Sequence, residues 1–201
     1  MKLSLDDIKD LRAYEREREE FRARIIELKR RRRVAVGPVV TLVFENQDTI
    51  RFQIQEMARA ERMLADADIQ AELDVYNPLI PESGELSATL FIELTSQEQM
   101  REWLPKLVGI ERSMVLRLGP GAEEVRAQPE ADHASQLTRD EITASVHYIR
   151  FSLTTDQVSA FEAGPVVLGA DHAAYPHGTE LSEATRVSLL EDLRGNPVSS
   201  V

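Results

Sequence analysis

Three residues that lie far apart in the sequence carry side chains that a metal site could use. His147 lies in SVHYIRFSL, His172 follows VVLGAD, and Glu61 lies in DTIRFQIQEMARAERML. Two imidazoles and a carboxylate suit iron, manganese or zinc. Because the chain has no cysteine, a cysteine-ligated cluster is excluded. No short motif such as HExxH is present, so the fold would have to assemble this site.

Other carboxylates could complete such a metal site. Glu56, Glu93 and Asp171 are weaker candidate ligands, and Glu72 is a spare oxygen donor. Asp171 precedes His172 at the end of a predicted strand, where side chains can converge on a cleft. A metal bound by these groups would activate oxygen, peroxide or water.

Glu61 is the most unusual of these residues, because the helix predicted over residues 48–64 places it on the apolar face. At about 100° per residue it falls between Ile54 and Met57. A carboxylate buried there needs a proton, a metal or a cationic partner, since an isolated buried charge is costly. Arg18 interrupts the apolar stripe of another predicted helix and could form a structural ion pair with Glu61.

The two histidines also have structural interpretations. In its predicted strand, His147 shares a side with Ile149 and Phe151, while Tyr148 faces the other way. His147 is therefore either a core imidazole, hydrogen-bonded to a Glu or Tyr, or a ligand. His172 is the better site candidate because it has a neighbouring acid and a loop position.

A long charged helix is predicted at the amino terminus, with Ser4 as its cap and its end near Arg33. Its apolar stripe consists of Leu11, Tyr14, Arg18, Phe21, Ile25 and Leu28. Their alternating spacing of three and four residues is typical of a heptad seam, but it also suits a helix packed on a sheet.

Charge is divided unevenly along the chain. Residues 1–33 carry 12 Lys and Arg against 8 Asp and Glu, whereas the remaining residues carry 12 against 27. This asymmetry favours docking of a basic arm onto its own acidic body or onto a neighbouring copy. We therefore expect a homo-oligomer that forms through the N-terminal helix.

The pattern predicts residues 1–33 as a helical arm, residues 34–195 as a single α+β domain, and residues 196–201 as a flexible tail. Strands are predicted at residues 39–45, 86–94, 113–118, 123–127, 143–153 and 165–171. Helices are predicted at residues 48–64, 67–76, 96–107 and 181–193, with a short one from residue 155. Several links between strands are too short for crossovers, which favours a mixed, mostly antiparallel sheet packed by helices.

Composition limits the compartment and the partners. No apolar run approaches the roughly 20 residues that cross a membrane, and charged residues open the chain, so we expect a cytoplasmic protein without a membrane partner. The basic run at residues 29–33 is the one feature that suits nucleic acid. With 5% aromatic residues there is little to stack bases on, so the composition argues against nucleic-acid binding as the function.

Six phrases of the sequence resemble an uncharacterised bacterial domain family about as long as this chain. They are YEREREEFRARIIELKRRRRVAVGP, FENQDTIRFQIQEMARAER, ELDVYNPLIP, LSATLFIEL, SVHYIRF and DHAAY. Genes of this family often lie beside genes for rubrerythrin-like proteins and iron–sulfur oxidoreductases. The resemblance therefore implies a redox or oxidative-stress role with a redox-protein partner, and it assigns no catalytic residues.

Three functions remain open from the sequence. The first is an accessory or binding protein of a redox system, which explains the charge asymmetry without any chemistry. The second is a metal-dependent enzyme or metal-binding protein with a His/Glu pocket, which explains the inward-facing polar groups. The third, a nucleic-acid-associated factor, has the least support.

Overall fold

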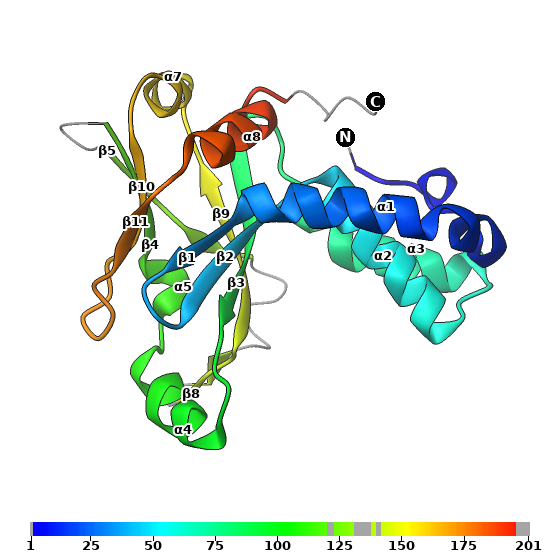
Figure 1. The fold of residues 1–201 in the computed structure, drawn as a ribbon, viewed down its shortest axis with the longest axis horizontal. Coiled ribbons are helices and arrows are strands. Elements are labelled where there is room, and N and C mark those ends of the chain that lie inside the picture. Colours follow the sequence, from blue (N-terminus) through cyan, green and yellow to red (C-terminus); the bar gives the residue numbers. More distant parts are fainter. Residues whose placement is uncertain (1, 120–122, 131–137, 140–141, 196–201) are drawn as a thin grey trace.

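The computed structural model of the chain describes residues 2–119, 123–130, 138–139 and 142–195 (Figure 1). Helices and strands are mixed in it, and every described strand pairing is antiparallel. The predicted α+β class, with a helix-packed antiparallel sheet and a long N-terminal helix, is confirmed. The tail predicted at residues 196–201 lies outside the described residues.

Two sheets pack face to face. The five-stranded sheet has the order β1-β2-β3-β9-β6, formed by Arg33–Val36, Val40–Glu45, Glu85–Ile92, Val146–Ser152 and Gln128–Pro129. The four-stranded sheet has the order β11-β10-β4-β5, formed by Gly178–Glu180, Val166–Ala170, Met114–Leu118 and Glu123–Arg126. A short separate pair consists of β7 (Thr138–Arg139) and β8 (Ile142–Thr143). Apolar side chains from both large sheets form the main hydrophobic core.

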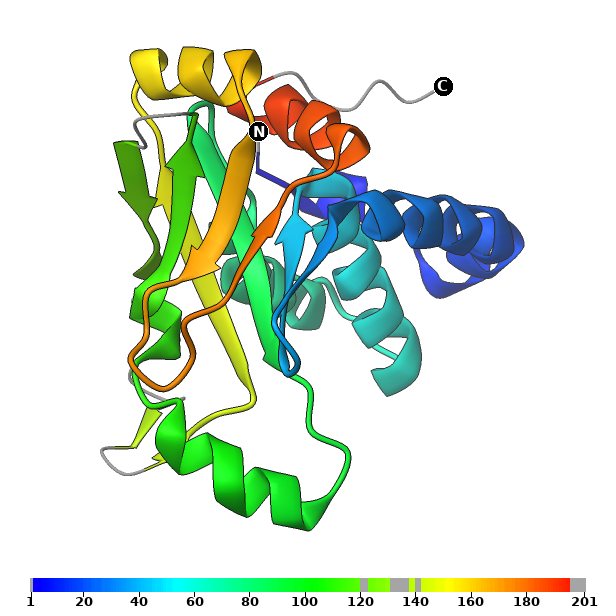
Figure 2. The ribbon, with the colours of Figure 1, turned by 60° about the vertical axis from the view of Figure 1, so that its left-hand side comes forward.

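Helices cover the outer face of the five-stranded sheet and both ends of the two sheets. The helices are α1 (Leu11–Arg32), α2 (Gln47–Glu61), α3 (Asp66–Tyr76), α4 (Gln97–Lys106), α5 (Ile110–Ser113), α7 (Thr155–Ala163) and α8 (Glu183–Leu193), with 3-10 turns η1 (Leu5–Asp7) and η2 (Asn77–Leu79). Figure 1 shows α1, α2 and α3 together on the side of the five-stranded sheet that faces away from the four-stranded sheet. α7 and α8 lie at one end of the sheets, and α4 lies at the other (Figure 2). No helix of the described residues is long and apolar enough to span a membrane.

The first helix begins later than its sequence pattern suggests. Ser4 caps only the turn η1, and Asp10 caps α1 by accepting a hydrogen bond from the backbone N–H of Ala13 at 2.9 Å. The Gln55 side chain bonds both backbone groups of Lys9, at 2.7 and 3.1 Å. This bridge satisfies the backbone of the linker, so the chain need not stay helical between the two caps.

α1 uses its apolar stripe within its own chain. It contacts α2, β2 and α8, and its buried Tyr14, Phe21, Ile25 and Leu28 form one cluster with Phe52 of α2. Each such side chain contributes roughly 1.5–3 kcal/mol when buried. The stripe is thus the core face of a packed helix, and a second copy would have to use another face. The division into an arm and a domain stays a prediction.

Strand alternation gives the five-stranded sheet two unlike faces. Leu42 and Phe44 of β2, with Leu90 of β3, point into the main core. Their neighbours point toward the helical layer, where Glu45 and Thr89 are found. A polar sheet face beneath helices is unusual, because buried polar groups need partners.

Candidate functional site

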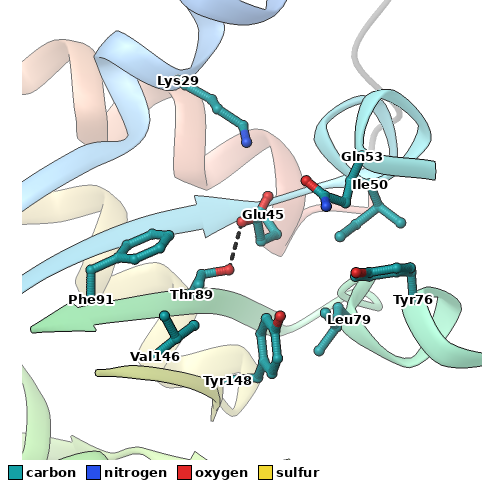
Figure 3. Close-up of a pocket in the computed structure, with 10 residues that line it drawn as sticks. All are labelled: Lys29, Glu45, Ile50, Gln53, Tyr76, Leu79, Thr89, Phe91, Val146 and Tyr148. Atoms are coloured by element: carbon teal, nitrogen blue, oxygen red, sulfur yellow. Dashed lines mark hydrogen bonds between the residues drawn. The ribbon is translucent and has the colours of Figure 1, made fainter. Parts of the chain in front are cut away.

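A pocket of about 190 Å³ lies on the polar face of the five-stranded sheet (Figure 3). Its walls come from β2, β3 and β9, the end of α1, the first turns of α2, the end of α3 and η2. Six of its lining side chains are polar, namely Lys29, Glu45, Gln53, Tyr76, Thr89 and Tyr148. Apolar side chains, among them Ile50, Leu79 and Phe91, complete the lining.

Glu45 is the central acid of this pocket. Only 7% of the residue is exposed, and its carboxylate accepts a hydrogen bond of 2.7 Å from the Thr89 hydroxyl. Its backbone is held from behind by the fully buried Arg32, which donates to the carbonyl oxygens of Phe44 at 2.9 Å and of Glu45 at 3.2 Å. Asn46 then caps α2. The strand end, the guanidinium and the cap together fix where the carboxylate points.

Two tyrosines bring hydroxyl groups to the pocket. Tyr148 lies on β9, which pairs with β3 so that Tyr148 is opposite Thr89. Burial raises the pKa of Tyr148, and the nearby Tyr76 and Glu45 raise it further. The Tyr148 hydroxyl therefore keeps its proton at neutral pH and can donate a hydrogen bond.

Lys29 faces Glu45 from the end of α1. Figure 3 shows its ammonium group directed toward the Glu45 carboxylate. Yet among the described residues neither group has an oppositely charged partner within 4.0 Å. The pocket thus presents one positive and one negative charge across a gap.

A wider groove of about 510 Å³ adjoins the pocket and shares Lys29, Glu45 and Phe91 with it. Its other lining residues are basic (Arg22, Arg30, Arg33) or apolar (Ile25, Ile26, Val43, Phe52). In the basic run at residues 29–33, Lys29, Arg30 and Arg33 line this groove, and Arg32 is buried. In a chain with a net charge of −11, such a concentration of cations attracts anionic groups.

Sequence reasoning did not select Glu45, Thr89 or Tyr148. A usable signal was present, because the two-residue period places Glu45 on the opposite side of its strand from Leu42 and Phe44. Three neighbouring strands each carry a polar residue on that side. The sequence pattern does not give the order of the strands, so it could not show that β2, β3 and β9 are neighbours.

Glu61 lies away from this pocket, and it is exposed. α2 ends at Glu61, and Arg62 follows with a left-handed backbone at φ 55°. Ile54 and Ala58 are buried, but beyond Ala58 the helix passes the edge of the core, and Leu64, three residues after the helix ends, is 84% exposed. The expectation of a buried carboxylate at Glu61 is thereby corrected: the apolar face ends before it.

Arg18 forms its ion pair with Glu56 in place of the predicted partner, Glu61. Its Nε and Nη2 atoms each donate to one oxygen of the Glu56 carboxylate at 2.8 Å, and the Tyr14 hydroxyl donates to the same carboxylate at 2.7 Å. This two-point pair joins α1 to α2. Glu61 instead lies near Glu72, where burial raises the pKa of the Glu72 carboxyl and the Glu61 carboxylate raises it further.

The two histidines have structural partners. His147 is 3% exposed, on the core side as predicted, and its Nε2 lies 2.9 Å from the Ala144 carbonyl and 2.8 Å from the Thr143 hydroxyl. Burial lowers its pKa, although the Glu111 carboxylate opposes this. His172 has its Nε2 3.1 Å from the Val108 carbonyl. The Nε2 atoms of both histidines therefore already take part in hydrogen bonds within the protein.

The remaining candidate ligands belong to separate ion pairs. Asp171 accepts from Arg126 at 2.7 Å, and Glu93 pairs with Arg33 and accepts from the Thr41 hydroxyl at 2.6 Å. Within the described part of the chain, no group of three or more His, Asp or Glu residues could hold a metal ion. The structure therefore does not bring Glu61, His147 and His172 together.

Replacing Glu56 with Gln should destabilise the protein at neutral pH but not in acid. The Arg18 hydrogen bonds lower the pKa of Glu56, so the carboxylate stabilises the fold above its unfolded pKa of about 4.3. This stabilisation is lost as the pH falls through the lower folded pKa, where wild type and variant converge. Urea unfolding across this pH range tests it, with Glu61→Gln as the exposed control. An equal effect of both substitutions at neutral pH would contradict the assignment.

The chain is similar to known sequences and structures over nearly its whole length. A family model described as "Protein of unknown function (DUF3501)" matches residues 2–193. A crystal structure of a novel protein of unknown function from Burkholderia pseudomallei K96243 is 39% identical, with a TM-score of 0.87. That similarity covers 96% of this chain and 100% of the other. No curated protein matches the chain.

Proposed function

We propose that this chain, which belongs to the DUF3501 family of proteins of unknown function, binds a small polar ligand in the pocket around Glu45. The observation that carries the proposal is the convergence of polar side chains from several elements on one cavity in the sheet face. Ligand sites are concave, and their polar side chains converge to fix the orientation of the ligand. A purely structural sheet face would bury apolar side chains there instead.

The dimensions of the site support a ligand larger than an ion. The pocket of about 190 Å³ and the groove of about 510 Å³ share three lining residues, so a ligand that extends past these side chains would occupy both. Typical small-molecule sites measure roughly 300–1,000 Å³. The groove supplies cations and an apolar floor, and the pocket supplies hydrogen-bonding groups. A short ligand with an anionic group fits this division.

This proposal keeps the binding-protein part of the sequence-based hypothesis. The redox or oxidative-stress role and the redox-protein partner stay predictions, because neither the family description nor the similar structure names an activity. Homo-oligomerisation through α1 also stays a prediction. The metal-dependent alternative finds no support among the residues that the structure describes.

Filling the pocket should abolish ligand binding without unfolding the protein. Gln53 lies on the first turns of α2 at the pocket wall, and its replacement by Trp would occupy the cavity. Saturation-transfer NMR with a defined mixture of amino acids, dicarboxylates and sugar phosphates measures binding. At least one component should bind wild type and the control Gln97→Trp, which alters an exposed position on α4, but not Gln53→Trp.

Two results would contradict the proposal. One is that no component of the mixture binds the wild-type protein. The other is that Gln53→Trp, shown to be folded by circular dichroism, binds the same components as wild type. In that case the ligand occupies some other surface.

A further inference from the structure

Glu45 and Lys29 are opposite charges in one pocket that do not touch. Glu45 is almost completely buried, and within the described residues its carboxylate accepts one hydrogen bond, from the Thr89 hydroxyl. Lys29 is half-buried at the end of α1. Neither has an oppositely charged partner within 4.0 Å in the described part of the chain. Burying a charged group is costly unless an opposite charge or hydrogen bonds compensate it. This arrangement therefore favours a ligand that pairs with both Glu45 and Lys29.

A ligand with one kind of charge would fit this pocket poorly. A simple carboxylate next to Lys29 would also approach Glu45, and a simple amine next to Glu45 would approach Lys29. Like charges brought together in a partly buried site repel each other strongly. A zwitterion avoids both conflicts, because its ammonium group can face Glu45 while its carboxylate faces Lys29.

The remaining lining groups suit an ammonium and a carboxylate held side by side. The rings of Phe91, Tyr76 and Tyr148 line the same cavity as Glu45, and aromatic rings attract ammonium groups. Figure 3 shows the Tyr148 hydroxyl and the Gln53 amide turned toward the space in front of Glu45. These groups can donate to a carboxylate or accept from an ammonium.

On this basis we propose that the ligand is an α-amino acid whose ammonium group binds Glu45 and whose α-carboxylate binds Lys29. The proposal rests on the proposed function, since it names the class of ligand for the same pocket. The amino acid side chain would extend into the groove, where Val43 and Phe52 form an apolar floor beside Arg22 and Arg30. A short aliphatic stem that ends in an acid matches this lining, so L-glutamate is the probe of choice.

Calorimetric titration of the full chain with three matched probes tests the ligand class. L-Glutamate should bind, whereas N-acetyl-L-glutamate, which lacks the ammonium charge, should bind at least about tenfold more weakly. The α-amide of L-glutamic acid, which lacks the α-carboxylate, should be weakened to a similar extent. Equal affinity for all three probes, or no binding of L-glutamate, would overturn the inference.

Two variants assign each charge of the ligand to its partner. Glu45→Gln keeps an acceptor for Thr89 and should remove the preference for L-glutamate over its N-acetyl form, while the preference over the α-amide remains. Lys29→Gln should do the reverse. The preference that each variant retains shows that the pocket is still folded. If both variants lose both preferences together, the assignment of the two charges is overturned.

The outcome separates this inference from the proposed function. If another component of the mixture binds wild type and is blocked by Gln53→Trp, while the α-amino acids do not bind, the pocket is a ligand site of another class and only this inference fails. If nothing binds at the pocket, both fail.

Discussion

Replacing Arg32 with Met is expected to lower the free energy of unfolding by about 3–5 kcal/mol, because it breaks a buried ion pair and leaves one charge behind. The Arg32 side chain is 0% exposed and pairs with Asp192 of α8, whose side chain is 6% exposed. It also donates to the Ser188 hydroxyl at 3.2 Å and to the two carbonyl oxygens at the end of β2. One guanidinium therefore joins α1, β2 and α8.

Urea unfolding measures this loss, and Arg31→Met at the exposed neighbouring position is the control. The double variant Arg32→Met, Asp192→Leu should recover much of the stability, since the unpaired carboxylate is then gone. A loss of less than about 1 kcal/mol for Arg32→Met would contradict the central role of this residue.

The effect of Arg32→Met should also depend on pH. Burial raises the pKa of Asp192, and Arg32 opposes that shift by stabilising the carboxylate. Without Arg32 the carboxyl takes up a proton more readily, and a neutral acid is cheaper to bury than a carboxylate. A raised folded pKa means that stability is lost as the pH rises through it, so the deficit of the variant should shrink toward the usual Asp pKa of about 3.9.

Replacing Tyr175 with Phe should cost about 2–4 kcal/mol, the second-largest effect that we expect. The fully buried Tyr175 hydroxyl donates to the Val36 carbonyl at 2.7 Å and accepts from the backbone N–H groups of Val39 and Val40 at 2.9 and 3.1 Å. These three groups belong to the turn between β1 and β2, which Gly37 closes with a φ of +71°. Phe would leave all three without this partner.

Thermal and urea unfolding measure the Tyr175→Phe effect, with Tyr76→Phe as a control at a half-buried tyrosine. If Tyr175→Phe and Tyr76→Phe lower the stability equally, the Tyr175 hydroxyl does not anchor the turn.

The Tyr175→Phe substitution should also weaken ligand binding at the pocket, because the turn precedes the strand that ends in Glu45. Burial also raises the pKa of Tyr175, so its hydroxyl stays protonated at neutral pH and this anchor persists.

Local patterns in the sequence were sufficient to predict most of the elements. The alternation in β9 placed His147 in the core and Tyr148 on the opposite face, and the structure confirms both positions. The helix predicted at residues 96–107 and the helix start predicted at Thr155 are likewise confirmed. These signals are local, because alternation and capping depend on residues a few positions apart. β1 and β11 were missed because their short segments become strands only by pairing with neighbours.

The site was decided by tertiary structure. The sequence by itself determined that Arg18 would interrupt an apolar stripe and would need an acid, but Glu56 and Glu61 were both available on the next helix. Which one it meets depends on where α1 crosses α2, and on the core ending before Glu61. Lys29 and Glu45 likewise carry no shared sequence signal. They face each other because the end of α1 lies over the end of β2, and long-range packing sets that position while local propensity does not.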